Sequence, residues 1–509
     1  MPIFLVLALV AACLPVRWSE ASLGFAPPRA AALTGGAVAL VLGFAFALRT
    51  FVVRTVRRDP TSRFEVARHY ATWRRRLFFL NVGTAAACVT ALGWGAAVQS
   101  EVYLTADGQK VLAPFAELLV PLPYFAVLLG CWLIYFGAER ALFAAQHPDR
   151  PFWSRGGYVW HHARQFVLLV MLPVLLVTGQ QTLGRYEPDV AQSDGFRVAL
   201  LCTGPLLVLL LPLLMKPVLG LKPLPPGPTR DRLEALARRL HFRCSDFLVW
   251  HTNGGAINAL IAGLVPRARY VVFTDRLLEE LPPDELDAVL GHEIGHAKHF
   301  HVWLYSLFLL LSLSTIAALV LFLAQRLDAA EAPEWVAARE SLAGLESWLV
   351  LPPVALTGAY LFFVFGALSR RCERQADVYG CKAVSCANPR CTGHDADTLF
   401  PEGAKCLCPT GVRTFARALD RVSGPQDAGP RGSVLGRAWR GFTEWVKHWT
   451  HGPIPKRIDY LLTLIDRPTE ERRFQCRVFA FKCVLVLGLV SALVALGTQV
   501  GWRALLDAM

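Results

Sequence analysis

The segment Pro282-Pro-Asp-Glu-Leu-Asp-Ala-Val-Leu-Gly-His-Glu-Ile-Gly-His296 carries the features that most constrain the fold of this chain. Proline suits the first turn of a helix, where its missing N–H group is not needed. The two carboxylates that follow suit the positively polarised start of a helix. The sequence therefore predicts a helix that begins at this proline pair and runs towards His301.

The residues His292, Glu293 and His296 form the pattern H-E-x-x-H on this predicted helix. Four residues apart, His292 and His296 present their imidazoles on one helical face to a single ion. Glu293 can reach a water molecule bound to a zinc ion. The metal lowers the pKa of this water to about 7. The pattern predicts attack of that water on a carbonyl group, with Glu293 as the general base. A surface helix with unrelated His and Glu side chains is the alternative.

A third ligand is expected, because catalytic zinc commonly has three protein ligands and one open position. The segment Ser369-Arg-Arg-Cys-Glu-Arg-Gln-Ala-Asp377 follows an apolar run. As a helix, it would place Glu373 on the metal, with Asp377 one turn later orienting a ligand imidazole. An ordinary juxtamembrane helix with salt bridges is the alternative.

The composition indicates a polytopic membrane protein. The chain has 509 residues, of which 54% are hydrophobic, and its mean hydropathy is +0.40. A membrane helix needs roughly 20 mostly apolar residues. On this basis we predict nine spans, at about 2–16, 31–50, 77–98, 113–136, 166–183, 197–219, 302–325, 347–368 and 477–500.

Arginine content predicts the orientation of these spans. The loops at 51–76 and 137–165 are rich in arginine and are expected to stay in the cytoplasm. The poorer connections should face outward; they lie at 99–112, 184–196 and 326–346. The chain is thus predicted to be a multi-pass protein of the cell's inner or plasma membrane, with a cytoplasmic N-terminus. The net charge of +13 is then a property of membrane loops, and no nucleic-acid-binding motif accompanies it.

The expected fold class is mainly α, with a cytoplasm-facing zinc domain that carries a small β-hairpin or sheet. Within this domain we predict an amphipathic helix over Thr229 to His241, a strand over Phe247 to Trp250, and a hairpin of Ile257 to Leu264 with Tyr270 to Thr274. The predicted divisions are a six-helix membrane region over 1–220, a catalytic segment over 221–301, two membrane helices over 302–368, a second catalytic segment with a Cys-rich insertion over 369–476, and a last membrane helix and tail over 477–509.

Taken in order, these motifs resemble the membrane zinc peptidases that include the type I CaaX prenyl protease and the heat-shock protease HtpX. That family has an apolar strand with Asn-Ala, then H-E-x-x-H, then S-R-x-x-E-x-x-A-D, then a late His-Pro segment with an Arg. The counterparts here are Asn258-Ala259, His292 to His296, Ser369 to Asp377, and His451-Gly-Pro-Ile-Pro-Lys-Arg457. The last departs from the family by one extra glycine. The resemblance covers about 230–465.

The resemblance implies a zinc domain of the gluzincin type, with Glu373 as the third ligand of one catalytic Zn²⁺. It implies a metalloendopeptidase in which Asn258, His451 and Arg457 stabilise the oxyanion or position the substrate backbone. It also implies that the run 257–264 is an edge strand to which a peptide substrate can add. The alternatives are that Asn258 is a turn residue, that His451 only starts a helix, and that the run is an ordinary hairpin strand.

Two further groups of residues have simpler interpretations. We interpret His299 and His301 as interfacial residues where the helix enters the membrane. The cluster Cys381-x4-Cys386-x4-Cys391 and Cys406-x-Cys408, with His394 between, is absent from the family pattern. A second, structural zinc ion is one hypothesis for it. Reduced thiols without a metal in a cytoplasmic loop are the interpretation that the sequence favours.

Other functions are weighed against the peptidase. A membrane chaperone or scaffold that retains the zinc fold is one, although Glu293 would then be the residue to lose. A metal transporter would need His or Asp inside the apolar helices, and they are not there. For a peptidase, the expected partners are the lipid bilayer and peptide or protein substrates, including membrane proteins. The sequence does not choose between prenylated-protein processing and membrane-protein quality control.

Overall fold

The computed structural model describes residues 9, 12–13, 22–101, 103–106, 109–166, 170–253, 255–328, 351–394, 399, 405–423, 449–467 and 469–508. The chain divides into two compact units. Unit 1 comprises Met1–Phe196 and Val336–Val354, and unit 2 comprises Arg197–Trp335 and Ala355–Met509. All the motifs predicted to carry the chemistry lie in unit 2.

Unit 1 is built mainly from helices, as expected. Three long helices share an apolar core that includes Val41, Val52 and Tyr135. They are α2 (Pro27–Arg58), α3 (Arg63–Val89) and α5 (Leu122–Gln146). Shorter elements lie between α3 and α5, namely α4 (Trp94–Glu101), β1 (Tyr103–Ala106) and β2 (Gln109–Leu112), and after α5, namely α6 (Arg155–Phe166), α7 (Leu172–Tyr186) and α8 (Pro188–Ala191). Much of the arginine-rich loop predicted at 51–76 is helical, because arginine is a good helix former and only the turn around Pro60 interrupts it.

Four helices are long and apolar enough to cross a membrane: α2, α5, α13 (His301–Asp328) and α20 (Thr469–Val500). They overlap the spans predicted at 31–50, 113–136, 302–325 and 477–500, although α5 begins nine residues later than predicted and extends to Gln146. The pair α3 and α4, bent by 45°, makes a fifth if it is one span. Most of the span predicted at 2–16, the connection at 326–346 and the start of the span at 347–368 lie outside the described residues. Nine spans and their orientation therefore stay predictions.

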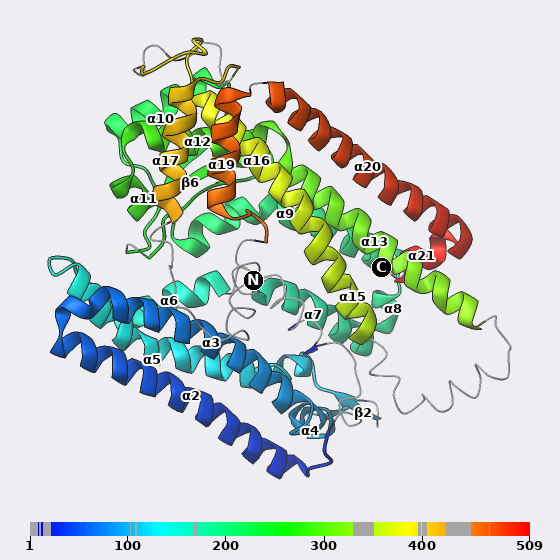
Figure 1. Cartoon of the computed structure of the whole chain (residues 1–509). Coiled ribbons are helices and arrows are strands. Elements are labelled where there is room, and N and C mark those ends of the chain that lie inside the picture. Colours follow the sequence, from blue (N-terminus) through cyan, green and yellow to red (C-terminus); the bar gives the residue numbers. More distant parts are fainter. Residues whose placement is uncertain are drawn as a thin grey trace, which may run out of the picture. The chain divides into compact units, whose positions relative to one another are not determined.

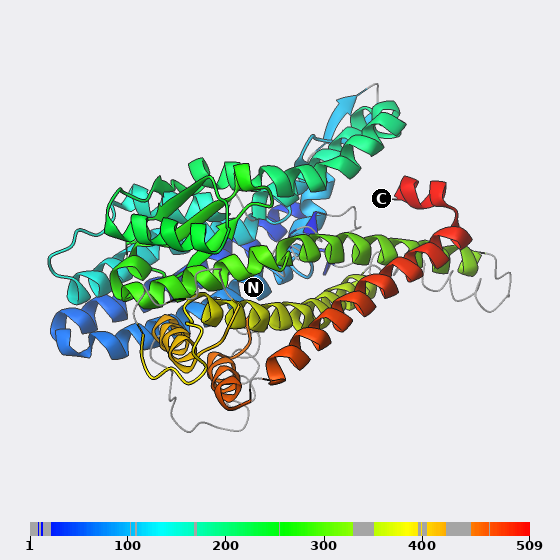
Figure 2. The ribbon, with the colours of Figure 1, turned by 90° about the horizontal axis from the view of Figure 1, so that it is seen from above.

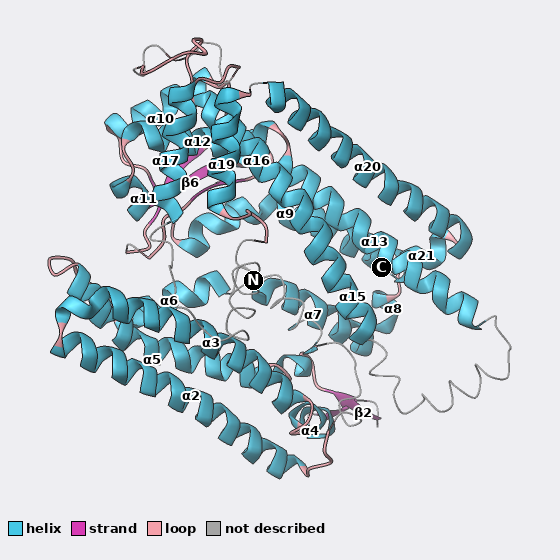
Figure 3. Ribbon diagram, viewed as in Figure 1, coloured by secondary structure: helices cyan, strands magenta, loops and turns pink. Residues whose placement is uncertain are grey.

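Unit 2 contains a mixed four-stranded sheet, seen among the helices in Figure 3. Its strands lie in the order β3 (Lys222–Pro223), β4 (Asp246–Trp250), β6 (Tyr270–Thr274) and β5 (Ala259–Ala262). The β4–β6 pair is parallel and the other two pairs are antiparallel. The predicted hairpin is confirmed, with Ile261 opposite Val271. Strand β5 lies at one edge of the sheet, as the resemblance implied.

Helices cover this sheet and join it to the apolar helices of unit 2. The predicted amphipathic helix is α10 (Pro228–Arg239), which buries Leu233 and Leu236 in a core shared with β4, β6 and α12 (Pro283–Lys298). Figure 1 shows this group of elements with its further helices, α11 (Asp275–Glu280), α16 (Gly366–Ala383), α17 (Pro409–Ser423) and α19 (Ile454–Asp466).

The apolar helices of unit 2 form a second layer. The chain enters it through α9 (Asp194–Leu219) and ends in α21 (Trp502–Ala508). In Figures 1 and 2, α13 runs beside α20 and beside a helical run that leads from α15 (Leu351–Tyr360) through a π-helical turn into α16. Phe308, Leu368 and Leu485 of these helices share one apolar cluster. The helix that carries Glu373 is thus a direct continuation of an apolar helix.

The helix predicted to run towards His301 breaks before it gets there. Helix α12 ends at Lys298 and α13 begins at His301. Between them Phe300 has a φ of 55°, in the left-handed region that non-glycine residues rarely adopt. The prediction was therefore wrong in its last turn. No glycine or proline marks the break, so the residue pattern could not locate it.

Helices α12 and α16 cross at glycines. A Cβ atom on Gly291 would lie 2.4 Å from the Cβ of Ala383, and one on Gly380 would lie 3.0 Å from the carbonyl oxygen of Ala288. Such contacts leave room for hydrogen only. The crossing brings the backbone of α12 against α16 beside His292, whose Cβ is 3.1 Å from the Cβ site of Gly380.

We predict that Gly291→Ala destabilises the protein although alanine is the better helix former. The helix gain is at most about 1 kcal/mol, whereas overpacking against a rigid methyl group costs about 1–3 kcal/mol. Thermal unfolding in detergent should give a lower midpoint than that of the parent. The control is Gly488→Ala in α20, where a Cβ meets no atom within 4 Å and the midpoint should not fall.

The double variant Gly291→Ala/Ala383→Gly moves one methyl group across the interface and removes the clash. Its midpoint should lie above that of Gly291→Ala, even though Ala383→Gly alone lowers helix propensity. A double variant less stable than both single variants would contradict the close crossing.

Candidate metal centre

Three side chains from two helices converge in unit 2. His292 and His296 of α12 and Glu373 of α16 each offer one ligand atom, and these atoms lie within 4.8 Å of one another. The Nε2 atom of His292 is 3.3 Å from that of His296. The two Nε2 atoms lie 3.8 and 3.5 Å from oxygens of Glu373. Two imidazoles and a carboxylate make a donor set that zinc accepts, so the residues fit the ion. Their role as ligands stays a prediction.

A buried ion-pair network lies behind His292. Its Nδ1 atom is 3.0 Å from Oδ1 of Asp377, which is 1% exposed. The Nε–H group of Arg457 donates to Oδ2 of Asp377 over 2.8 Å, and Nη2 lies 3.6 Å from Glu373. A carboxylate on Nδ1 fixes the ring and leaves Nε2 for a metal.

Arg457 also makes the buried carboxylates tolerable. Burial disfavours the charged form of Asp377, but Arg457 and His292 outweigh that effect and hold the pKa of Asp377 well below its usual range. At His292, burial opposes protonation, but the contact with Asp377 outweighs it and raises the pKa of the imidazole.

A second buried chain of hydrogen bonds lies behind His296. Its Nδ1 atom is 3.0 Å from Nδ1 of His301, and Nε2 of His301 is 3.0 Å from Oε1 of Gln375. Lys482 donates to the same oxygen over 2.8 Å, so that oxygen is an acceptor and His301 must donate to it. Nδ1 of His301 then accepts the proton of His296 Nδ1, and Nε2 of His296 keeps a free lone pair for a metal.

The interpretation of His301 as an interfacial residue is therefore wrong, because its side chain is fully buried and contacts His296. On a continuous helix, five residues correspond to a rotation of about 140°, which would turn His301 away from His296. The left-handed break at Phe300 turns it back. His299 is not one of the three candidate ligands.

Glu293 lies in a cavity of about 470 Å³ together with the three candidate ligands. Its carboxylate accepts a hydrogen bond from the backbone N–H group of Ile261, on the edge strand β5. Burial raises the pKa of Glu293 to about 7, while His292 acts in the lowering direction. A carboxylate with a pKa near neutrality can take up a proton and release it again.

Asn258 and His451 line the same cavity. Asn258 precedes β5, and its backbone N–H group donates to Oγ1 of Thr274 over 3.0 Å. Nδ1 of His451 lies 2.9 Å from Oε1 of Glu373. Burial raises the pKa of Glu373, but the hydrogen bond from His451 and the surrounding charges lower it to about 2. The extra Gly452 has a φ of 76°, so the insertion is absorbed in a turn that still brings His451 to the centre.

The remaining walls of the cavity are mainly apolar. Phe415 of α17 stacks on the ring of His292, with 5.6 Å between centroids. Phe300, Val302 and Trp303 also line the cavity, and Phe300 and Trp303 are 66% and 51% exposed. These residues stand at the start of α13, one of the helices long enough to span a membrane. One side of the cavity is thus formed by the first turn of an apolar helix.

Known proteins are similar to the part of the chain that carries these residues. Residues 227–464 match the model of peptidase family M48. A protease HtpX homolog of Methanocaldococcus jannaschii is 30% identical over 130 residues, which cover 25% of this chain and 42% of that protein. A CAAX prenyl protease 1 homolog of Dictyostelium discoideum is 31% identical over 157 residues, which cover 30% of this chain and 36% of that protein. The chain thus matches less than half the length of each relative.

Among solved structures, Ste24p of S. mikatae is similar with a TM-score of 0.46 and 15% identity, over 84% of this chain and 98% of that chain. The M48 match includes the H-E-x-x-H motif and the segment with Glu373. The resemblance to membrane zinc peptidases that the motifs indicated is confirmed over this region.

We predict that His301→Phe weakens metal binding, because phenylalanine fills the space but cannot accept the proton of His296. Loss of such a partner typically costs 10–100-fold in metal affinity. Competition for zinc with a chromophoric chelator measures the change, and thermal unfolding checks that the variant folds. The control, His299→Phe, alters the neighbouring histidine and should keep the affinity of the parent. A folded His301→Phe protein with parental affinity would contradict the proton assignment.

Proposed function

We propose that this chain is a zinc-dependent integral-membrane metalloendopeptidase that hydrolyses peptide bonds in the cavity described above. The supporting observation is that His292, His296 and Glu373 converge beside Glu293, next to the edge strand β5. A bound zinc ion supplies Lewis-acid chemistry, since it polarises a carbonyl group and lowers the pKa of a water molecule to about 7. The M48 match supports the choice of zinc and of peptide bonds.

The sheet edge suggests how a substrate binds. An extended peptide can add to β5 by main-chain hydrogen bonds, since within the described part of the chain β5 pairs with β6 alone. The cavity is lined by Ala259, Leu260 and Ile261 of β5 on one side and by α12 on the other. A peptide paired with β5 would place a backbone carbonyl near the metal centre. Recognition through the main chain favours an endopeptidase with modest side-chain selectivity.

The proton chemistry is assigned to Glu293. It would take the proton of the attacking water and pass it to the leaving amine. Asn258 and His451, which both line the cavity, are the candidates that stabilise the oxyanion. Arg457 has a different assignment from the one that the resemblance implies. Its guanidinium group binds Asp377 through two nitrogens, so we propose that it positions His292 through Asp377.

The site is proposed to face the cytoplasm at the membrane surface. Trp303 is an aromatic residue at the start of a helix that can span the bilayer, and tryptophan favours the membrane interface. An opening there gives membrane-associated polypeptides direct access. Quality control of membrane proteins and processing of prenylated proteins both meet this requirement. The chain is similar both to a protease HtpX homolog and to a CAAX prenyl protease 1 homolog. A chaperone or scaffold without turnover is the alternative.

The deciding variant is Glu293→Gln, which keeps the shape of the side chain but removes the base. We predict that the purified variant retains one zinc ion at His292, His296 and Glu373, while cleavage falls at least about 100-fold, the lower limit of what general-base catalysis contributes. Cleavage of an unfolded membrane protein and of a prenylated CaaX peptide is followed by mass spectrometry, with and without prior removal of the metal by a chelator.

The matched control is Asp284→Asn, on the same helix but with its side chain 50% exposed, and it should cleave as the parent does. Equal cleavage by Glu293→Gln and the parent would refute the mechanism. If the parent binds zinc and holds unfolded protein but cleaves neither substrate under any condition, the scaffold function holds instead.

A further inference from the structure

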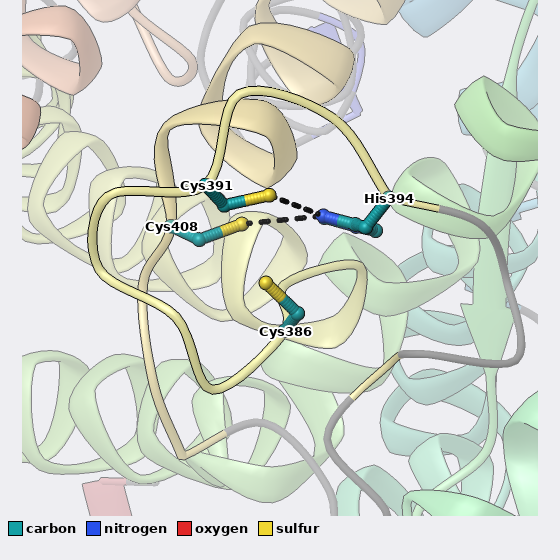
Figure 4. Close-up of side chains that lie close together, drawn as sticks. All are labelled: Cys386, Cys391, His394 and Cys408. Carbon is teal, nitrogen blue, oxygen red and sulfur yellow. Dashed lines mark hydrogen bonds between the residues drawn. The ribbon is translucent and has the colours of Figure 1, made fainter.

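A second group of metal-ligand residues lies in the loop between α16 and α17. Cys386, Cys391, His394 and Cys408 each offer one atom, all within 4.8 Å of one another. Figure 4 shows the three sulfur atoms and the imidazole ring of His394 turned towards a common point. The other cysteines of the motif, Cys381 and Cys406, lie outside the group. The structure thus brings together four of the six residues of this cluster. From the sequence alone we favoured reduced thiols without a metal.

His394 distinguishes this group from ordinary packing of thiols. Its Nε2 atom lies 3.0 Å from the carbonyl oxygen of Val384. A carbonyl oxygen can only accept, so Nε2 carries the proton of the neutral ring. The lone pair is then on Nδ1, which lies 3.1 Å from the sulfur of Cys391 and 3.7 Å from that of Cys408. A histidine held by a carbonyl on one nitrogen, with the other directed at thiols, has the arrangement of a metal ligand.

Cys408 lies where a thiolate is stabilised. It directly precedes α17, and its sulfur accepts a hydrogen bond from the backbone N–H group of Gly411 over 3.3 Å. The sulfur therefore occupies the place of a capping group at the positively polarised end of a helix, which favours a negative charge. Oγ1 of Thr410 lies 3.3 Å from the sulfur of Cys391. These two sulfur atoms thus each have a polar hydrogen-bond partner beside the point that the four side chains share.

The distances suit a single ion. A tetrahedral zinc site with zinc–sulfur bonds of about 2.3 Å has edges of about 3.8 Å. The two sulfur–nitrogen distances from His394 are 3.1 and 3.7 Å, and every other pair lies within 4.8 Å. Shifts of about 1 Å or less in the side chains would complete the tetrahedron. Three cysteines and one histidine are a standard set for structural zinc.

The described part of the loop is centred on its cysteines and not on large apolar side chains. Among its described residues, the buried cysteines Cys386, Cys391 and Cys408 form an apolar cluster of their own. Their exposed fractions are 7%, 4% and 1%, although Asn388, Pro389 and Arg390 beside them are exposed. Small segments without a hydrophobic core commonly depend on a metal or disulfides. Three cysteines cannot all pair as disulfides, whereas with one histidine they complete a metal site.

We propose that Cys386, Cys391, His394 and Cys408 bind a structural zinc ion that holds the loop between α16 and α17. This site is separate from the candidate catalytic centre and does not rest on the proposed peptidase function. Its closure would fix the start of α17 against the end of α16. Helix α17 carries Phe415, which stacks on His292. The structural zinc ion would therefore also stabilise one wall of the cavity.

Metal analysis of the full chain in detergent tests this proposal. We expect two zinc ions per chain in the parent by mass spectrometry of the metal. Cys391→Ser/Cys408→Ser should retain one, and so should His292→Ala/His296→Ala, which removes the other site. The control is Cys406→Ser, in the same loop but outside the group, which should keep two. One zinc ion in the parent, or two in Cys391→Ser/Cys408→Ser, would overturn the proposal.

Cobalt substitution adds a measurement that needs no change to the loop. Cobalt bound by thiolates absorbs in the near ultraviolet by charge transfer from sulfur, and a site of two imidazoles and a carboxylate does not. The band should be present in His292→Ala/His296→Ala and in the parent. Its absence from the folded, cobalt-loaded parent would refute thiolate ligation. Titration of the denatured protein should find all 13 thiols; a count of 11, or bound iron in place of zinc, would also contradict the assignment.

Discussion

The close crossing of α12 and α16 is the constraint on which the metal centre depends. Candidate ligands on two separate helices can share one ion only if the helices pack closely enough for both side chains to reach it. Gly291 and Gly380 provide that approach, since a methyl group at either position meets atoms within 3.0 Å. The crossing also sets the depth of Asp377, one turn beyond Glu373 on α16, so that one packing contact places a ligand and the partner of another. Gly291, directly before the first histidine of the motif, is therefore as necessary to the candidate centre as the two histidines.

Each imidazole of the candidate centre is oriented by its own buried network, and the two networks differ in charge. Behind His292 the partner is charged, and Asp377 is neutralised by Arg457. Behind His296 the partners are neutral, and the orientation is passed through His301 to Gln375. A second carboxylate there would add buried negative charge next to Glu373, whose desolvation is costly. A histidine and an amide fix the same tautomer without that charge, and Lys482 determines which way the amide faces.

The residue pattern predicted the parts of the structure that depend on local periodicity. The helix of the H-E-x-x-H motif could be predicted from the prolines and carboxylates at its start. Helix α10, β4 and the β5–β6 hairpin could be predicted from their apolar residues, which follow helical or strand patterns. The convergence of Glu373 on the two imidazoles followed from ligand chemistry. The role of His301 could not be found in this way, because it depends on one left-handed residue, Phe300, that belongs to no turn signature. The grouping of four residues out of a six-residue Cys/His cluster likewise depends on the path of a loop.

The break at Phe300 also separates the helix of the metal-ligand motif from an apolar helix. It ends the helix that carries both histidines, and His301 is the first residue of α13, an apolar helix of membrane-spanning length. The residue that orients a candidate metal ligand is therefore also the first residue of a candidate membrane span. The start of α13 can therefore move little relative to α12 if Nδ1 of His301 is to keep its hydrogen bond with His296. A tilt of α13 that moved its first turn would act on the metal centre through a single hydrogen bond. The turn of the chain that contacts His296 thus also brings Trp303 to the cavity.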